Sequence, residues 1–218
     1  MGYKHFKALI FDFDYTLGDS TEGIVLSVNH ALSKLGYVEK DMDEIRKTIG
    51  LSLKDTYFAL TGKDNLSEAA LFSQYFKEEA DKVMVDNTEL YPNVKESLSN
   101  LRKQGCKTGI VTTKFHYRIE QILKKCNVSD LVDLIVGAED VKIEKPNPEG
   151  LLLAIEQLGI VKGDILYVGD SLVDAQTARN AGVDFVGVLT GTTTREEFEN
   201  YPNLYIGDTI AEIVKYVL

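Results

Sequence analysis

Residues 7–16 read KALIFDFDYT, and this segment contains the clearest indication of the fold class. Its apolar run, Ala8 to Phe11, stops at Asp12, and Asp14 follows two positions later. A brief apolar run bounded by turn-forming residues is typical of a strand that is buried on both faces. We therefore expect a buried parallel strand whose carboxyl end carries two aspartates.

Downstream of Pro92, apolar runs of strand length alternate with amphipathic helical segments. This alternation predicts an α/β fold, in which a mostly parallel sheet has helices on both faces and includes the strand at 7–13. The other expected strands are at 107–112, 131–136, 164–168, 183–188 and 205–206, and the expected helices are at 94–104, 116–125, 148–158, 171–181 and 210–217.

Residues 17–86 follow a different pattern, with apolar stripes at helical spacing and no segment typical of a strand. We expect an all-helical domain inserted into the α/β domain, which then comprises residues 1–16 and 87–218. We expect four helices in this domain. The first is capped by Asp19 or Ser20 and ends at Gly36, and the second is short and begins near Met42. The third is capped by Ser52 and ends at Gly62, and the fourth begins at Ser67.

The composition is that of an ordinary globular protein, with 44% hydrophobic and 27% charged residues in 218. Ten more acidic than basic side chains, a net charge of −10, argue against nucleic acid or an anionic membrane as a partner. The apolar run near the N-terminus is too short for a signal peptide, and the two cysteines, Cys106 and Cys126, fit a reducing compartment. We therefore expect a cytoplasmic protein.

The residues that follow the predicted strands carry the chemistry, because open α/β sheets bind ligands at the carboxyl ends of their strands. Carboxylates together with a lysine suit Mg²⁺ and a phosphate group, and an aspartate can act as the nucleophile in phosphoryl transfer. The candidates at this edge are Asp12 and Asp14, Thr112 to Lys114, Lys145, and Asp170 to Asp174.

Four motifs occur in the order that is typical of the haloacid dehalogenase-like hydrolases, which the chain resembles over nearly its whole length. They are DFDYT at 12–16, IVTT ending at Thr113, the pair Lys145-Pro146, and GDSLVD ending at Asp174. The resemblance is greatest to the phosphoglycolate phosphatase-like branch. It implies a Rossmann-like core with a helical cap domain inserted after the first motif.

The resemblance also implies roles for the catalytic and phosphate-binding residues. Asp12 is expected to be the nucleophile, and Asp14 the acid that protonates the leaving oxygen and the base that then activates water. Thr112 is expected to bind the phosphate through its hydroxyl, with help from the backbone N–H of Thr113. Lys145 is expected to neutralise phosphate charge.

For Mg²⁺, the resemblance implies four ligands: Asp12, the backbone carbonyl of Asp14, Asp170, and Asp174 either directly or through water. Two positions depart from the family pattern. Tyr15 stands where the family usually has Gly, which tolerates a positive φ that Tyr adopts less readily. The family often has Asn where this chain has Thr113, a change that preserves a backbone contact.

The function expected from these residues is hydrolysis of a small phosphorylated metabolite, phosphoglycolate-like or a sugar phosphate, by a Mg²⁺-dependent phosphatase. Inorganic pyrophosphatase activity is an alternative that the sequence GIVTTK also fits. A β-phosphoglucomutase-type phosphotransferase is another alternative, but Ile24 and Leu53 align with its cap His and Arg. A non-catalytic regulatory protein fits less well, since the acidic set is complete.

Other metal sites are not favoured. Asp12 and Asp14 begin like a calcium-binding EF-hand loop, but that loop needs Gly and Glu where Leu17 and Gly23 stand. The histidines show no zinc-ligand spacing with each other or with the cysteines. The segment 190–194, TGTTT, lacks the lysine of a phosphate-binding P-loop and is interpreted as a loop near the rim of the cleft.

Overall fold

The structure is a computed structural model, and it describes residues 5–218. The chain divides into two compact units. The α/β unit contains the chain up to Gly18 together with Leu90–Leu218, and the helical unit contains Asp19–Glu89. The sequence-based division, after residues 16 and 86, placed each boundary slightly earlier in the chain.

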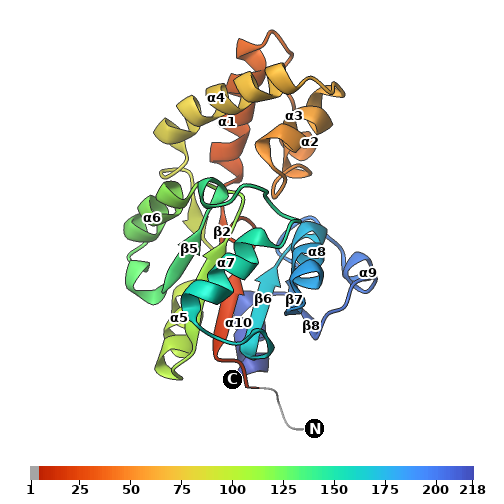
Figure 1. The fold of residues 1–218 in the computed structure, drawn as a ribbon. Helices are drawn as coiled ribbons and strands as arrows, with labels where there is room; N and C mark the ends of the chain where they lie inside the picture. Colours follow the sequence, from red (N-terminus) through yellow and green to blue (C-terminus); the bar gives the residue numbers. More distant parts are fainter. Residues whose placement is uncertain (1–4) are drawn as a thin grey trace. The chain divides into compact units, whose positions relative to one another are not determined.

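A six-stranded parallel sheet forms the centre of the α/β unit, with strand order β5-β4-β1-β6-β7-β8 (Figure 1). The mostly parallel sheet expected from the sequence is confirmed, and every pairing in it is parallel. The strands are β1 (Ala8–Phe11), β4 (Lys107–Val111), β5 (Leu134–Val136), β6 (Ile165–Gly169), β7 (Asp184–Val188) and β8 (Tyr205–Gly207).

Helices of the α/β unit pack on the sheet in pairs: α7 packs on α8, and α5 packs on α10. In Figure 1, α7 and α8 lie in front of the sheet. The helices are α5 (Val94–Lys103), α6 (His116–Lys125), α7 (Glu149–Leu158), α8 (Leu172–Ala181), α9 (Arg195–Phe198) and α10 (Ile210–Val217), with 3₁₀ turns at Ser129–Leu131, Ala138–Asp140 and Lys162–Asp164.

The core of the α/β unit lies between the sheet and its helices. All four residues of β1 are completely buried, as its apolar sequence predicts for a central strand. Alternate side chains such as Ala8 and Ile10 pack toward Leu151 of α7 and Ala178 of α8. Burial of each large apolar side chain contributes about 1.5–3 kcal/mol, so this layer fixes the sheet whose end carries the polar residues.

The helical unit contains α1 (Thr21–Lys34), α2 (Met42–Arg46), α3 (Leu53–Thr61) and α4 (Leu66–Val83). Helix α1 packs against α4, and the aromatic rings of Tyr57 and Phe72 lie in the buried cluster between helices. The predicted cap at Ser52 is confirmed, since its hydroxyl accepts from Asp55 N. The predicted start of the last helix at Ser67 is wrong, because Asn65 caps it instead.

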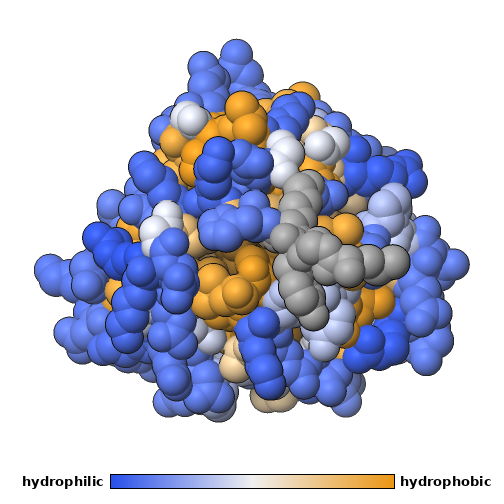
Figure 2. Space-filling model, turned by 90° about the horizontal axis from the view of Figure 1, so that it is seen from below, coloured by the Kyte–Doolittle hydropathy of each residue, from blue (hydrophilic) through white to orange (hydrophobic). Residues whose placement is uncertain are grey.

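Two-residue strands lie where the chain passes between the units. Strand β2 (Gly18–Asp19) pairs with β3 (Glu89–Leu90), so the expectation of no strand near residue 18 is wrong. Among residues 5–218 no helix is long and apolar enough to cross a membrane. The face seen in Figure 2 is mostly hydrophilic with separate apolar areas, in keeping with the high charge content.

Candidate active site

The carboxyl ends of three neighbouring parallel strands bring the predicted residues to one edge of the sheet. Asp12 follows β1, Thr112 follows β4, and Asp170 follows β6. Backbone hydrogen bonds continue the pairing past the strand ends, since Asp12 N donates to Val168 O at 2.9 Å and Thr112 N donates to Val136 O at 3.1 Å. The sheet itself therefore holds these side chains side by side.

Asp12, Asp170 and Asp174 form a buried carboxylate cluster. Each offers one oxygen, and these oxygens lie within 4.8 Å of one another. The Asp12 side chain is almost completely buried. Buried carboxylates at such spacing are the hard oxygen ligands that suit Mg²⁺.

Lys145 is the cation beside this cluster. Its Nζ lies 2.7 Å from Asp174 Oδ1 and 3.0 Å from Asp12 Oδ1, and its side chain is buried. Burial alone would lower the pKa of Lys145, but the charges of Asp12 and Asp174 outweigh burial and raise its pKa well above the ordinary value. Lys145 is therefore a permanent positive charge at the place where the sequence predicts phosphate binding.

Two carboxyl groups of the cluster are hard to ionise without a further cation. Burial, partly opposed by Lys145 and reinforced by Asp174 and Asp14, raises the pKa of Asp12 to about 6. Burial and the charges of Asp174 and Asp12 raise the pKa of Asp170 well above its usual range. When all three carboxylates are ionised, they and Lys145 carry a local charge of −2, which a divalent cation would balance. The residues present therefore fit Mg²⁺.

Glycines allow backbone to approach the cluster. A Cβ atom on Gly191 would lie 2.0 Å from Asp170 Oδ2, and one on Gly169 would lie 2.4 Å from the Asp174 side chain. The loop that contains Gly191 also contacts the first motif, since the Thr190 hydroxyl donates to the backbone oxygen of Tyr15. The loop at 190–194 therefore forms part of the wall of the carboxylate cluster.

Asp14 has a different environment from the cluster. Its Oδ2 lies 3.0 Å from Nζ of Lys114, and both side chains are buried. Burial lowers the pKa of Lys114, although Asp14 opposes this effect. Asp14 Oδ1 accepts no hydrogen bond from the described part of the chain. One oxygen of Asp14 is thus fixed by a lysine, and the other makes no hydrogen bond within residues 5–218.

The two predicted phosphate-binding threonines lie directly after β4. Thr112 is buried, and its Oγ1 accepts a hydrogen bond from Lys114 N at 3.3 Å. Thr113 is half-buried. The intervening backbone therefore forms a tight turn that leads from β4 into α6.

Tyr15, which replaces the usual Gly, does adopt the left-handed conformation, with φ 58°. Its backbone N–H donates to Gly18 O at 2.8 Å, and its side chain is buried. A non-glycine residue in this region costs on the order of 1–2 kcal/mol. The first motif thus keeps the geometry that the family's glycine would allow, and burial of the tyrosine ring offsets the strain.

Several residues of the site had no role assigned from the sequence. The Thr16 hydroxyl donates to Asp170 Oδ1 at 3.2 Å. Ser171 caps α8, in a reciprocal arrangement with Asp174. The phenol of Tyr167 contacts Lys145 and Asp174. A tyrosine in an otherwise apolar, fully buried strand is a signal that could have identified this residue, because a buried hydroxyl needs a partner.

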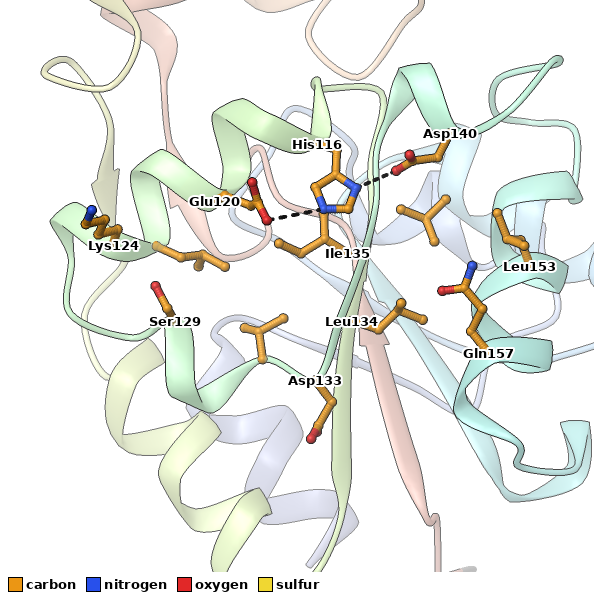
Figure 3. Close-up of a pocket in the computed structure, with 13 residues that line it drawn as sticks. His116, Glu120, Lys124, Ser129, Asp133, Leu134, Ile135, Asp140, Leu153 and Gln157 are labelled. Carbon is orange, nitrogen blue, oxygen red and sulfur yellow. Dashed lines mark hydrogen bonds and ion pairs between the residues drawn. The ribbon is translucent and has the colours of Figure 1, made fainter.

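A separate cavity of 690 Å³ lies beside β5 (Figure 3). His116 lies on its wall, with Nδ1 2.6 Å from Asp140 Oδ2 and Nε2 3.7 Å from Glu120 Oε1. The other labelled residues come from α6, β5, α7 and the segments next to them. Asp12, Asp170, Asp174 and Lys145 do not line this cavity, so it is distinct from the carboxylate cluster.

Comparisons with known proteins show which family of proteins this chain is similar to. Residues 9–188 match the family profile described as haloacid dehalogenase-like hydrolase. A pyrophosphatase PpaX from Bacillus mycoides is 31% identical over 208 residues, and a phosphoglycolate phosphatase from Colwellia psychrerythraea is 30% identical over 217; each match covers 95% of both chains. A crystal structure of a haloacid dehalogenase-like hydrolase from Bacteroides fragilis has a TM-score of 0.93 and 43% identity, covering 95% of this chain and 99% of that one.

Proposed function

The chain belongs to the haloacid dehalogenase-like hydrolase family, and on that premise we propose that it is a Mg²⁺-dependent phosphatase acting on a small phosphorylated metabolite. The substrate class is a phosphoglycolate-like acid or a sugar phosphate, and the reaction passes through an aspartyl-phosphate on Asp12. The observation that carries the proposal is the buried cluster of Asp12, Asp170 and Asp174 beside Lys145.

In the first step we propose that an oxygen of Asp12 attacks phosphorus. A bond forms between that oxygen and phosphorus, and the bond from phosphorus to the leaving oxygen breaks. The hydroxyl of Thr112 and the backbone N–H of Thr113 donate to the phosphoryl oxygens, and Lys145 balances their charge. Fixed donors of this kind stabilise the charge that develops in the transition state.

We propose that Asp14 is the general acid and general base of the reaction. It gives a proton to the leaving oxygen in the first step and removes one from water in the second, when water attacks phosphorus and Asp12 is released. The Asp14 oxygen that accepts no hydrogen bond from residues 5–218 supports this role, since the other oxygen is held 3.0 Å from Lys114. Lys114 would then orient the acid and base.

The metal ligands we propose are Asp12, the backbone carbonyl of Asp14, Asp170, and Asp174 directly or through water. Mg²⁺, when bound, would reduce the repulsion between the carboxylates and the incoming phosphoryl group. The net charge of −2 that the three ionised carboxylates and Lys145 carry together supports a divalent rather than a monovalent ion.

We further propose that the helical unit, Asp19–Glu89, is the cap that selects the substrate, and that the protein acts in the cytoplasm. The net charge of −10 of the whole protein argues against nucleic acid and anionic membranes as partners. Cys106 and Cys126 form no disulfide within residues 5–218, which suits a reducing compartment.

Hydrolysis of inorganic pyrophosphate is the second candidate function. It is favoured by the 31% identity to a protein named pyrophosphatase PpaX, a value close to the 30% identity to a phosphoglycolate phosphatase. Both reactions would use the same nucleophile and ligands. They differ in the leaving group.

The test is phosphate release by the full chain from 2-phosphoglycolate, sugar phosphates, nucleotides and pyrophosphate, with and without Mg²⁺. We expect at least one substrate to be hydrolysed with Mg²⁺ and none after chelation with EDTA. The substrate with the highest kcat/KM distinguishes the two candidate functions. A folded protein that releases no phosphate from any of these compounds would contradict both.

A further inference from the structure

The hydroxyl of one buried tyrosine joins three segments of the candidate active site. We propose that Tyr167 is a positioning residue: its phenol fixes Asp174 and Lys145 relative to the end of β4, and so sets the geometry of the metal site. The inference rests on the proposed function for its catalytic consequence, whereas its effect on Mg²⁺ binding can be measured without any substrate.

Three contacts converge on the Tyr167 oxygen. It lies 3.0 Å from Asp174 Oδ1, 3.1 Å from the backbone oxygen of Val111, and 3.3 Å from Lys145 Nζ, which donates to it. Val111 is the last residue of β4, directly before Thr112. A single oxygen atom thus connects the phosphate-binding turn, the lysine and the second aspartate of the last motif.

The phenol has one hydrogen and two acceptors within reach, Asp174 Oδ1 and Val111 O. It can donate to only one of them at a time. When Asp174 carries full negative charge, donation to the carboxylate is stronger, because hydrogen bonds to ionised acceptors are about twice as strong as neutral ones. When a cation draws charge from Asp174, the proton can turn to Val111 O, so Tyr167 stays satisfied in both situations.

The other partners of Asp174 make the phenol important for its orientation. Asp174 Oδ2 accepts from the Ser171 hydroxyl at 2.5 Å and from Ser171 N at 3.2 Å. Asp174 Oδ1 accepts from Tyr167 and from Lys145 at 2.7 Å. Both oxygens therefore accept hydrogen bonds, and loss of the phenol leaves Oδ1 held by Lys145 alone.

The fold holds the phenol in place. Tyr167 is on the central strand β6, fully buried, and its ring centroid is 6.4 Å from that of Phe185. Replacement by Phe keeps the ring and its packing, so Tyr167→Phe removes the hydroxyl and little else. Removal of a hydrogen-bond partner behind a metal ligand typically lowers metal affinity or activity 10–100-fold.

The helical unit supplies a matched control. Tyr57 is also fully buried, and its hydroxyl also donates to a carboxylate, that of Glu68, at 2.6 Å. Tyr57→Phe removes the same chemical group from the other unit. A general loss of stability would affect both variants alike, whereas a positioning role affects only Tyr167→Phe.

The experiment measures the rise in melting temperature of the full chain with increasing Mg²⁺, for wild type, Tyr167→Phe and Tyr57→Phe. Binding to the folded state raises Tm by mass action, so the Mg²⁺ concentration that produces a given rise in Tm is proportional to the dissociation constant. We expect this concentration to be about tenfold higher for Tyr167→Phe than for wild type and unchanged for Tyr57→Phe. With the preferred phosphate substrate, we expect kcat of Tyr167→Phe to fall about tenfold with KM within about twofold.

A wild-type Mg²⁺ response in Tyr167→Phe, or equal shifts in the two variants, would overturn the proposal. Circular dichroism confirms that each variant is folded. Wild type could release no phosphate from any substrate while the Mg²⁺-dependent rise in Tm still differs between Tyr167→Phe and Tyr57→Phe as expected. In that case the proposed function fails, and the positioning role of Tyr167 in the metal site stands.

A double variant tests whether Tyr167 acts through Asp174. If it does, Tyr167→Phe combined with Asp174→Asn should bind Mg²⁺ no more weakly than Asp174→Asn alone. A further tenfold loss in the double variant would show that the phenol acts independently of Asp174, and would contradict the proposal.

Discussion

Each unit of the molecule contains a buried tyrosine whose hydroxyl donates a hydrogen bond to a carboxylate. The two hydrogen-bond networks differ in the groups that surround that carboxylate. In the helical unit, Glu68 accepts from the hydroxyls of Tyr57 and Tyr37. In the α/β unit, Asp174 accepts from Tyr167 but lies beside two further carboxylates. One network is complete by itself, and the other has an excess of negative charge.

The direction of the pKa shifts follows from this difference. The hydroxyls of Tyr37 and Tyr57 lower the pKa of Glu68, so its charged form is stabilised by folding. Burial and neighbouring carboxylates raise the pKa of Asp12 to about 6, so its charged form is destabilised by folding. A carboxylate with hydrogen-bond donors, such as Glu68, stabilises the fold, whereas a buried cluster of carboxylates such as that of Asp12 is typical of a site that binds a cation.

The largest expected effect is the loss of activity when a carboxylate of the α/β unit is replaced, compared with replacement of Glu68 in the helical unit. Asp12→Asn should lower phosphatase turnover by more than about 10⁴-fold, because an amide is a poor nucleophile and a weaker ligand. At pH 7.5 without Mg²⁺ its Tm should equal or exceed that of wild type, since the substitution removes a buried negative charge. Phosphate release and a thermal melt on the same sample measure both.

Glu68→Gln is the control for this prediction, since it alters a carboxylate in the other unit. It should keep wild-type turnover. An Asp12→Asn protein that is folded and turns over at a rate near wild type would contradict the role of Asp12.

Loss of the proton-transfer group comes next in size. Asp14→Asn should lower the rate about 10²–10⁴-fold for substrates with a poor leaving group. The loss should be smaller for p-nitrophenyl phosphate, whose leaving group needs no proton. Steady-state kinetics on both substrates measure the difference, and equal losses would count against the acid role of Asp14.

Removal of the cation beside the cluster should have a somewhat smaller effect. Lys145→Ala should lower kcat/KM by about 10²–10³, with both KM and kcat affected, because the phosphate carries charge before and during the reaction. Lys142→Ala alters an exposed lysine of the same loop and should be neutral. If the two variants have the same kinetics, Lys145 is not part of the phosphate site.

The smallest effect concerns the stability of the helical unit. Since the pKa of Glu68 is lowered by folding, its contribution to stability is full above the ordinary value of 4.5 and is lost as pH falls through the folded value. Glu68→Gln should therefore lower Tm slightly at pH 7, and the difference in Tm from wild type should shrink below about pH 4.5. A gap that is constant from pH 7 to pH 3 would show that the charge of Glu68 is unimportant.

The parts of the fold that depend on local pattern could be predicted from the sequence. The alternation of apolar runs and helical stripes predicts the parallel sheet, and strand ends predict where Asp12, Thr112 and Asp170 meet. The position of β1 at the centre follows from its continuous apolar sequence, ALIF at Ala8–Phe11.

Contacts between residues far apart in the chain could not be predicted in this way. The contact of Gly191 with Asp170 depends on how the loop after β7 folds back. The pairing of Lys114 with Asp14 depends on side-chain direction in a turn. Tyr15 adopts φ 58° because burial and backbone hydrogen bonds outweigh its local preference, which no short-range rule anticipates.

Calorimetric titration of the full chain with Mg²⁺, for wild type and for Asp170→Asn, tests whether the buried carboxylates hold the metal. We expect one Mg²⁺ bound per wild-type chain, through the cluster of Asp12, Asp170 and Asp174, and binding weakened at least about tenfold in Asp170→Asn. The same stoichiometry and affinity in both proteins would contradict the assignment of this cluster as the metal site.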